Sequence, residues 1–179
     1  MTTVHSDCAM VPEFTWEPVT ATGDQFALRV DDEAIAQMRK DWRAQGRITC
    51  KVRKHLMVVE TRHGGLRVAL GSTGDTLAEF QQGRGGALVK LTGDRWLRWI
   101  IPNRQGFARG FVAHATGVPR IDGHNVVLFA RDGIAIVLGG RRILVGPSDG
   151  APSLHEYDLL LALGWFLILV DGPAVPPPR

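Results

Sequence analysis

The apolar positions of the chain are most concentrated near its C-terminus, in Leu159–Val170, a stretch with one glycine and no polar face. A helix that is apolar on every side must be covered on every side. Ser153 and Glu156 have the spacing of a capping box, and residues 171–173 read Asp-Gly-Pro, a typical helix stop. We therefore predict a central core helix over 153–170 that the remaining chain wraps.

A membrane anchor is the alternative interpretation of this stretch. The uninterrupted apolar run has 12 residues, whereas crossing a bilayer takes about 20. Extending the run toward the N-terminus brings in Asp158, Glu156 and His155. We therefore favour a core helix and expect no transmembrane span. A tail anchor is the competing hypothesis, because the stretch lies so close to the C-terminus.

A second helix is predicted over Asp31–Gln45. Ile35, Met38 and Trp42 fall at positions i, i+3 and i+7, which form one apolar stripe on a helix, and Gly46 follows as a stop signal. We expect this amphipathic helix to pack by its stripe and to expose its charged residues.

Between residues 47 and 145 the period of the apolar positions changes to 2, which predicts β-strands. Glycine-rich turns separate these strands, and no helical pattern lies between them. This spacing is typical of an antiparallel sandwich or barrel. The predicted strands are 48–58, 66–70, 76–80, 87–91, 95–101, 107–114, 126–130, 134–138 and 141–145, and two shorter candidates, 14–16 and 26–30, precede them.

The two ends of the chain are predicted to differ from the rest. Residues 1–25 contain two prolines and little periodicity, so we expect an extended N-terminal arm, and residues 172–179 are a proline-rich tail. The chain has 179 residues, of which 45% are hydrophobic and 22% charged. This composition predicts a single globular domain over 26–171 with a sizeable core.

The number of cysteines indicates in which cellular compartment the protein is expected. Cys8 and Cys50 are the only cysteines and do not form a CxxC motif. Two thiols do not make a disulfide framework, so a reducing cytoplasm is the expected location. The first residues show neither a basic nor an apolar signal region, so we expect no signal peptide.

Net charge is +3 but is distributed unevenly, with −4 over residues 1–28, +9 over 29–120 and −2 over 121–179. A basic middle section attracts phosphate-bearing partners, which include nucleic acid, anionic lipid and phosphorylated metabolites. The alternative is that these arginines only keep outward strand positions soluble.

The most distinctive group of residues in this section combines cations with tryptophan. Cations supply charge and hydrogen bonds for phosphate, and an exposed tryptophan suits a membrane interface. An outward polar sheet face is the alternative interpretation. The residues predicted to bind an anionic group are Lys51, Arg53, Lys90, Trp96, Arg98, Arg104 and Arg109.

Enzyme motifs are weak. Residues 146–150 match the G-x-S-x-G pattern around Ser148, but the required downstream acid and histidine are missing in that order, since His155 is the only later histidine. The six histidines show no metal-ligand spacing. We therefore predict no catalytic residue, no metal and no cofactor. An enzyme with a loop-built site using Ser148, His155 or His114 is a lower-ranked hypothesis.

A set of strand–turn–strand hairpins followed by an apolar C-terminal helix resembles the Tubby-like superfamily, which includes tubby domains, phospholipid scramblases and LURP-one-related proteins. The resemblance rests on residues 66–80, 96–111, 126–138 and 153–172. It implies a mostly β (α+β) fold: a closed antiparallel barrel of about 10–12 strands enclosing a hydrophobic helix. It also implies binding rather than catalysis, since tubby domains bind phosphoinositide head groups.

The leading hypothesis is therefore a non-enzymatic binding protein, cytoplasmic or peripheral at the membrane, that recognises anionic phospholipid or a phosphorylated ligand. A protein–protein interaction module or homo-oligomer, which would use the N-terminal arm and strand edges, is the main alternative. Nucleic acid ranks last, because no motif that reads DNA or RNA is present.

Overall fold

The computed structural model describes residues 13–40, 47–62, 65–83, 86–93, 95–102, 104–113, 125–130, 132–138, 143–145 and 153–171. These residues form fourteen strands and one helix. In chain order the elements are β1 (Glu13–Pro18), β2 (Gln25–Val30), β3 (Glu33–Lys40), β4 (Arg47–Val52), β5 (His55–Arg62), β6 (Gly65–Leu70), β7 (Thr76–Gly83), β8 (Gly86–Leu91), β9 (Arg95–Ile100), β10 (Arg109–Ala113), β11 (Asn125–Phe129), β12 (Ile134–Val137), β13 (Ile143–Val145), β14 (Leu154–His155) and α1 (Glu156–Asp171).

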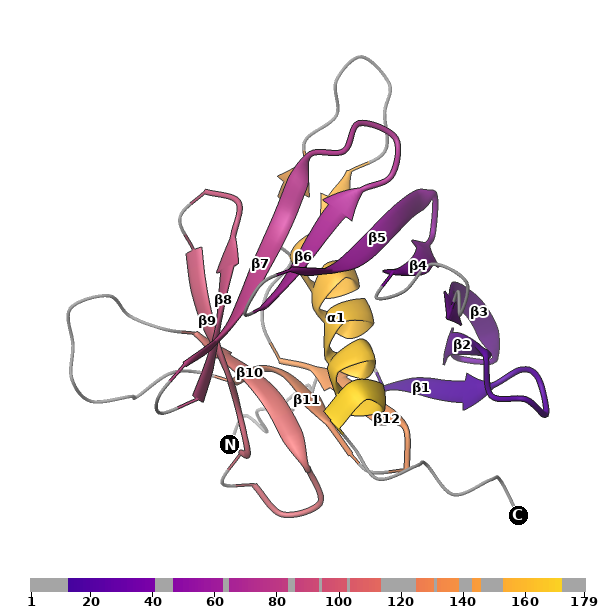
Figure 1. Cartoon of the computed structure of the whole chain (residues 1–179). Helices are drawn as coiled ribbons and strands as arrows, with labels where there is room; N and C mark the ends of the chain where they lie inside the picture. Colours follow the sequence, from indigo (N-terminus) through magenta and orange to yellow (C-terminus); the bar gives the residue numbers. More distant parts are fainter. Residues whose placement is uncertain are drawn as a thin grey trace, which may run out of the picture.

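Strands β1 to β12 form a closed barrel (Figure 1). Each strand pairs antiparallel with its neighbours in the chain, and β1 closes the wall by pairing antiparallel with β12, with Thr15 opposite Ile134. The short strands β13 and β14 form a separate two-stranded sheet that leads into α1. The prediction of a mostly β, antiparallel barrel with one C-terminal helix is confirmed.

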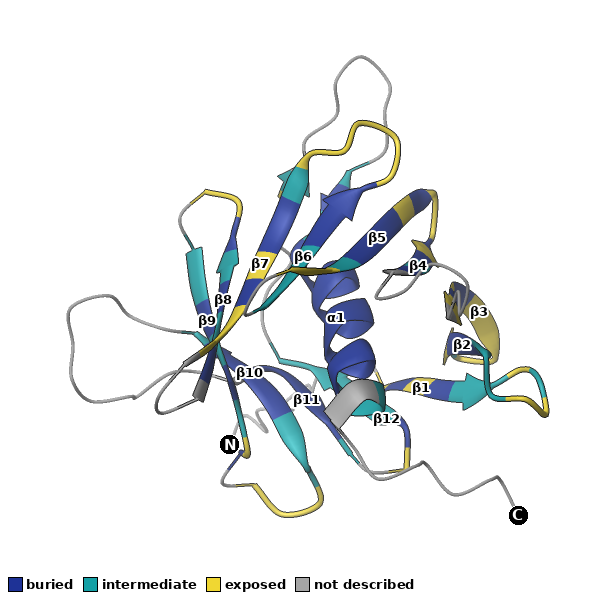
Figure 2. Ribbon diagram, in the orientation of Figure 1, coloured by how far each residue is buried: buried dark blue, intermediate teal, exposed yellow. Residues whose placement is uncertain are grey.

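The helix α1 lies inside the barrel and supplies the centre of the core (Figures 1 and 2). Residues 159–163 of the helix are buried, as are the inward side chains of the surrounding strands. Trp165 stacks on Trp16 of β1 at 6.0 Å between ring centroids and meets the edge of Phe26 of β2 at 6.1 Å. The apolar stretch near the C-terminus is therefore covered by strands on several sides.

Close approach of α1 to β10 and β11 depends on Gly164. A Cβ atom at this position would lie closer than 3.0 Å to Cζ and Cε2 of Phe129, and 3.0 Å from Cε2 of Phe111. Both rings are buried and point into the barrel from β11 and β10. A glycine is thus required where the helix crosses this pair of aromatic rings.

The structure begins its helix three residues later than the sequence predicts, since Leu154 and His155 form β14 and α1 starts at Glu156. Within the described residues, no helix combines the length and the hydropathy needed to cross a membrane. The proline-rich residues 172–179 lie outside the described part of the chain.

The amphipathic helix predicted over Asp31–Gln45 is wrong for its first ten residues. Asp31 and Asp32 adopt positive φ angles of 48° and 65° and form the turn that leads into strand β3. The β2–β3 register shifts at a bulge that leaves Ile35 unpaired, so that both Ile35 and Met38 are buried although they are three residues apart in a strand. The bulge explains the misleading helical spacing. Residues 41–46 lie outside the described residues.

The barrel also takes in part of the predicted N-terminal arm. Strand β1 lies between β2 and β12 and directs Phe14 and Trp16 into the core. The turn between β1 and β2 carries Asp24, whose carboxylate accepts hydrogen bonds from Thr20 and Thr22. Residues 1–12 are outside the described part.

Candidate functional site

The seven residues predicted to bind an anionic group are spread over the barrel. Lys51 lies on β4, whereas Lys90 and Arg98 lie on β8 and β9. Strands β5, β6 and β7 stand between β4 and β8. Four strand spacings of about 4.8 Å separate β4 from β8 by roughly 19 Å along the wall. The seven residues therefore do not form one site.

Lys90 belongs to a row of alternating charges on the outer wall. The strand registers place Glu60 opposite Arg67, Arg67 opposite Glu79, and Glu79 opposite Lys90. Arg67 Nη1 lies 3.4 Å from Glu60 Oε2, and Lys90 Nζ lies 5.5 Å from the ring centroid of Trp96 on β9. Acids and bases balance along this row. For Lys90, the structure therefore favours the outward polar face over a phosphate site.

Arg53 is engaged by the central helix. It sits in the turn between β4 and β5, and its Nε lies 3.5 Å from Oδ2 of Asp158, a carboxylate buried in the first turn of α1. On the other side, Arg95 Nη2 of β9 lies 3.0 Å from Oε1 of the buried Glu156. These two pairs join the start of the helix to opposite walls. They position α1 and compensate two buried charges.

Burial dominates the electrostatics at this end of the barrel. It raises the pKa of Asp158, and the positive charge of Arg53 lowers that pKa only in part. Nε2 of His55 lies 3.3 Å from the backbone oxygen of Ser153, and His155 stacks on Tyr157 at 5.7 Å. Among the described residues, no group of histidine, cysteine, aspartate and glutamate side chains could hold a metal ion.

Arg104 and Arg109 lie at the other end of the wall. Strand β9 runs away from Arg95, beside the start of α1, so the turn that follows it is at the opposite end. Arg104 is exposed in this turn, with its guanidinium carbon 5.5 Å from the centroid of the Phe107 ring. Arg109 begins β10 opposite Phe129 and is half-buried. Neither is near Lys51.

Lys51 lies beside a second exposed cation that the sequence did not single out. Its partner, Arg39, lies on the neighbouring strand β3, directly opposite Thr49, which is two residues from Lys51 on the same face. Such diagonal neighbours lie about 7 to 8 Å apart. Both cations are exposed, and neither forms an ion pair with any residue in the described ranges.

The residues directly opposite these two cations in the strand registers are neutral. The register places Gln25 of β2 opposite Arg39 and Gln37 of β3 opposite Lys51. We call this part of the outer wall the basic face: Gln25, Gln37, Arg39, Thr49 and Lys51. The charge of Arg39 helps to lower the pKa of Asp24, although hydrogen bonds from Thr20 and Thr22 are the larger causes.

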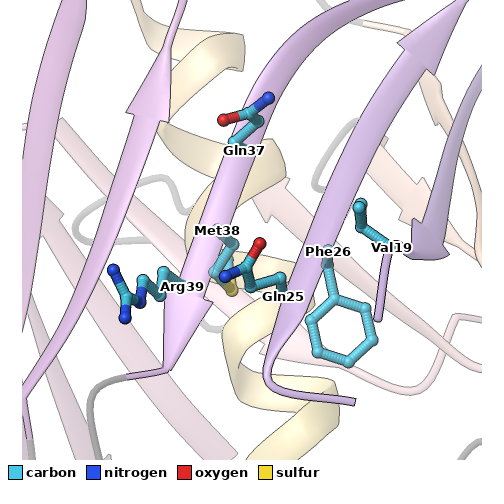
Figure 3. Close-up of a pocket in the computed structure, with 6 residues that line it drawn as sticks. All are labelled: Val19, Gln25, Phe26, Gln37, Met38 and Arg39. Carbon is cyan, nitrogen blue, oxygen red and sulfur yellow. The ribbon is translucent and has the colours of Figure 1, made fainter. Parts of the chain in front are cut away.

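A pocket of about 220 Å³ adjoins the basic face (Figure 3). Its polar lining comes from three members of that face, and its apolar lining comes from Phe26 and Met38, which belong to the core, and from Val19, which is 59% exposed. Figure 3 shows these side chains on β2, on β3 and just after β1, with α1 behind them. The lining residues are Val19, Gln25, Phe26, Gln37, Met38 and Arg39.

Sequence reasoning missed Arg39 because it assigned that residue to a helix. The cation becomes significant only through the pairing of β3 with β4, which brings it beside Lys51. For the hypothesis of a loop-built enzyme site, Ser148 and His114 lie outside the described residues. The buried thiol of Cys50 has a pKa raised to about 12 by burial, which makes it a poor nucleophile.

Comparison with known proteins finds no relative of this chain. No protein-family model, no curated protein and no solved structure matches the chain. The function must therefore be argued from the residues themselves.

Proposed function

We propose that this protein is a non-enzymatic binding protein that recognises anionic phospholipid or a phosphorylated ligand through the basic face. The observation that supports this proposal most directly is the pair Arg39 and Lys51, two exposed cations on adjacent strands that form no ion pair with a carboxylate among the described residues. A guanidinium and an ammonium together suit a phosphate group, because one offers a planar fork of donors and the other a point charge. Strands β5 to β8, by contrast, carry the balanced row from Glu60 to Lys90.

Membership of the Tubby-like superfamily is part of the proposal. Its support is the arrangement of twelve antiparallel strands closed around an apolar C-terminal helix, which is the arrangement that the resemblance implies. Recognition of an anionic group by basic residues on the outside of the barrel fits the binding role that the resemblance also implies. The proposed residues are Arg39 and Lys51, and the peripheral cytoplasmic location follows from this role.

Vesicle flotation at low salt tests the proposal. The chain is mixed with neutral vesicles or with vesicles that contain a phosphoinositide. The double variant Arg39→Gln/Lys51→Gln is compared with Lys90→Gln/Arg104→Gln, which changes the net charge equally. Each cation near an anionic surface contributes about 1 kcal/mol, so removing the first pair should weaken binding by about 2 kcal/mol, roughly 30-fold. The control pair should change binding by less than about 3-fold.

Two results would count against the proposal. Equal flotation with neutral and phosphoinositide vesicles would remove the anionic ligand class. Equal loss in the two double variants would mean that net charge alone drives binding, and the basic face would then have no special role.

The alternative of a protein-interaction module receives less support. The closed pairing of β1 with β12 leaves no free strand edge among the twelve strands of the barrel wall. Addition of a partner strand to that wall would first require a pair of strands to separate.

A further inference from the structure

Two of the four large apolar side chains that are exposed among the described residues border the basic face. Val19 donates its backbone N–H to the backbone oxygen of the neutral Gln25 at 2.9 Å. Leu56, on β5, lies directly opposite the cation Lys51. Both Leu56 and Lys51 are exposed, and side chains opposite one another on a sheet face have Cβ atoms about 4.5 to 5.5 Å apart. Leu56 therefore extends the basic face with an apolar group beside a charge.

Gly71 leaves Leu56 uncovered on the side away from Lys51. The backbone N–H of Gly71 donates to the backbone oxygen of Leu56 at 2.7 Å, and a Cβ atom on Gly71 would lie 3.0 Å from Cγ and Cδ2 of Leu56. The leucine side chain thus rests against a residue that has no side chain to hide it. On its other side, the methylene stem of Lys51 adds apolar surface while the ammonium stays in a polar environment. Apolar groups beside cations are typical of protein surfaces that lie in a membrane interface.

We propose that the basic face lies against an anionic bilayer, with Leu56 inserted at the boundary between head groups and acyl chains and with Lys51 at a lipid phosphate. The inference rests on the proposed function and selects a lipid in a bilayer over a free phosphorylated ligand. A free ligand of this kind engages the cations but leaves Leu56 in water. A bilayer engages the cations and also removes the leucine side chain from water, which is favourable in proportion to the apolar area that it covers.

The charges near Leu56 indicate from which direction a bilayer approaches. Lys54, in the turn between β4 and β5, is a further exposed cation two residues before Leu56. The turns before β3 and β7 lie at the same end of the antiparallel wall and carry the exposed carboxylates of Asp31, Asp32 and Asp75. An anionic surface repels these carboxylates. The bilayer should therefore meet the side of the wall along β3, β4 and β5 rather than the end of the barrel.

Flotation of the full chain with phosphoinositide vesicles tests this inference through Leu56→Gln. The matched control is Ile101→Gln, which changes a side chain that is 71% exposed in the turn after β9. Leu56 is 46% exposed, so about half of the gain from burying a leucine is lost, and vesicle binding should weaken by about 3- to 10-fold. The control should leave vesicle binding unchanged. Calorimetric titration with inositol trisphosphate, a soluble head group, should give the same affinity for Leu56→Gln as for the original chain.

A fluorescent label detects insertion itself. In a Cys8→Ser background, Leu56→Cys is labelled with an environment-sensitive fluorophore, and the buried Cys50 is not available to the reagent. Addition of phosphoinositide vesicles should shift the emission of this label to shorter wavelength, and spin-labelled lipids in the same vesicles should quench it. The same label on Ile101→Cys should show neither change.

The outcomes separate the inference from the function on which it rests. If vesicles bind but the label at position 56 stays in water, insertion of Leu56 is overturned and the basic face stands. Equal losses in Leu56→Gln and Ile101→Gln would also overturn it, because exposed apolar surface in general would then drive binding. Binding of inositol trisphosphate without binding of vesicles would show that the ligand is a free phosphorylated compound. If neither vesicles nor inositol trisphosphate binds, the proposed function fails and takes the inference with it.

Discussion

Replacement of Gly164 by alanine tests whether α1 is held as tightly inside the barrel as its contacts indicate. On helix propensity alone this change should stabilise the protein, since alanine is favoured over glycine in a helix by about 1 kcal/mol. In this structure the new methyl group would lie closer than 3.0 Å to two ring carbons of Phe129 and 3.0 Å from one of Phe111. The packing cost and the propensity gain therefore have opposite signs.

The packing cost should be the larger of the two. Phe111 and Phe129 are fully buried and lie 6.1 Å apart edge to face, so neither ring can move without displacing other core atoms. Overpacking of this kind costs about 1 to 3 kcal/mol. Because two rings are affected, we expect the upper part of this range. After the propensity gain, the Gly164→Ala variant should lose about 1 to 2 kcal/mol of unfolding free energy.

Urea unfolding followed by circular dichroism measures this loss, with Phe129→Leu as a companion variant. Phe129→Leu removes the ring atoms that meet the new methyl group, so the double variant should be more stable than the sum of the two single effects predicts. A Gly164→Ala protein as stable as the original chain, or more stable, would refute the tight approach of α1 to β10 and β11.

Three further predictions concern buried polar groups. Burial raises the pKa of Asp158 above its ordinary value of 3.8. Ionisation of this carboxyl therefore lowers the free energy of unfolding progressively as pH rises from 3.8 to the pKa of Asp158 in the folded protein. The advantage of Asp158→Asn in unfolding free energy should therefore increase over that window and then level off, and parallel stability curves would contradict this. Arg95→Leu removes the guanidinium that lies 3.0 Å from the buried Glu156. Because it deletes one member of a buried ion pair, it should cost about 3 to 5 kcal/mol in urea unfolding, whereas a loss under about 1 kcal/mol would show that the pair is not buried. In a Cys8→Ser background, Cys50 should resist thiol reagents at pH 8 until urea unfolds the chain, because its pKa is about 12; rapid labelling of the folded protein would contradict its burial.

The central helix could be predicted because its signal is local. Leu159–Val170 is apolar on all sides, and only enclosure by other elements satisfies such a helix in water. Most strands after residue 47 could also be predicted from their period of 2 and their glycine turns. The predicted strand 48–58 was wrong, because a turn at Arg53 divides it into β4 and β5, which pair antiparallel. Strand β3 was missed because the bulge at Ile35 produces an apolar spacing that resembles that of a helix. The segment is a strand because it pairs with β2 on one side and with β4 on the other.

Much less of the candidate site could be predicted from the sequence. Lys51 was selected for its charge, but the value of that charge depends on which strands stand beside it, and Arg39 becomes its neighbour only through the β3–β4 register. Arg53 was also chosen for its charge, but in the structure it forms an ion pair with Asp158, which lies more than a hundred residues later in the chain. Contacts between residues so far apart in the chain cannot be predicted from the spacing of residues in a single sequence.

The position of α1 at the end of the fold has a consequence for biosynthesis. All twelve wall strands are synthesised before residues 156–171, and closure of the wall joins Thr15 to Ile134. Pairing between such distant residues is slow, and the inward apolar side chains have no partner until the last segment emerges. A chain that stops before Glu156 would therefore leave the apolar interior of the wall uncovered, and we expect such a truncated chain to aggregate.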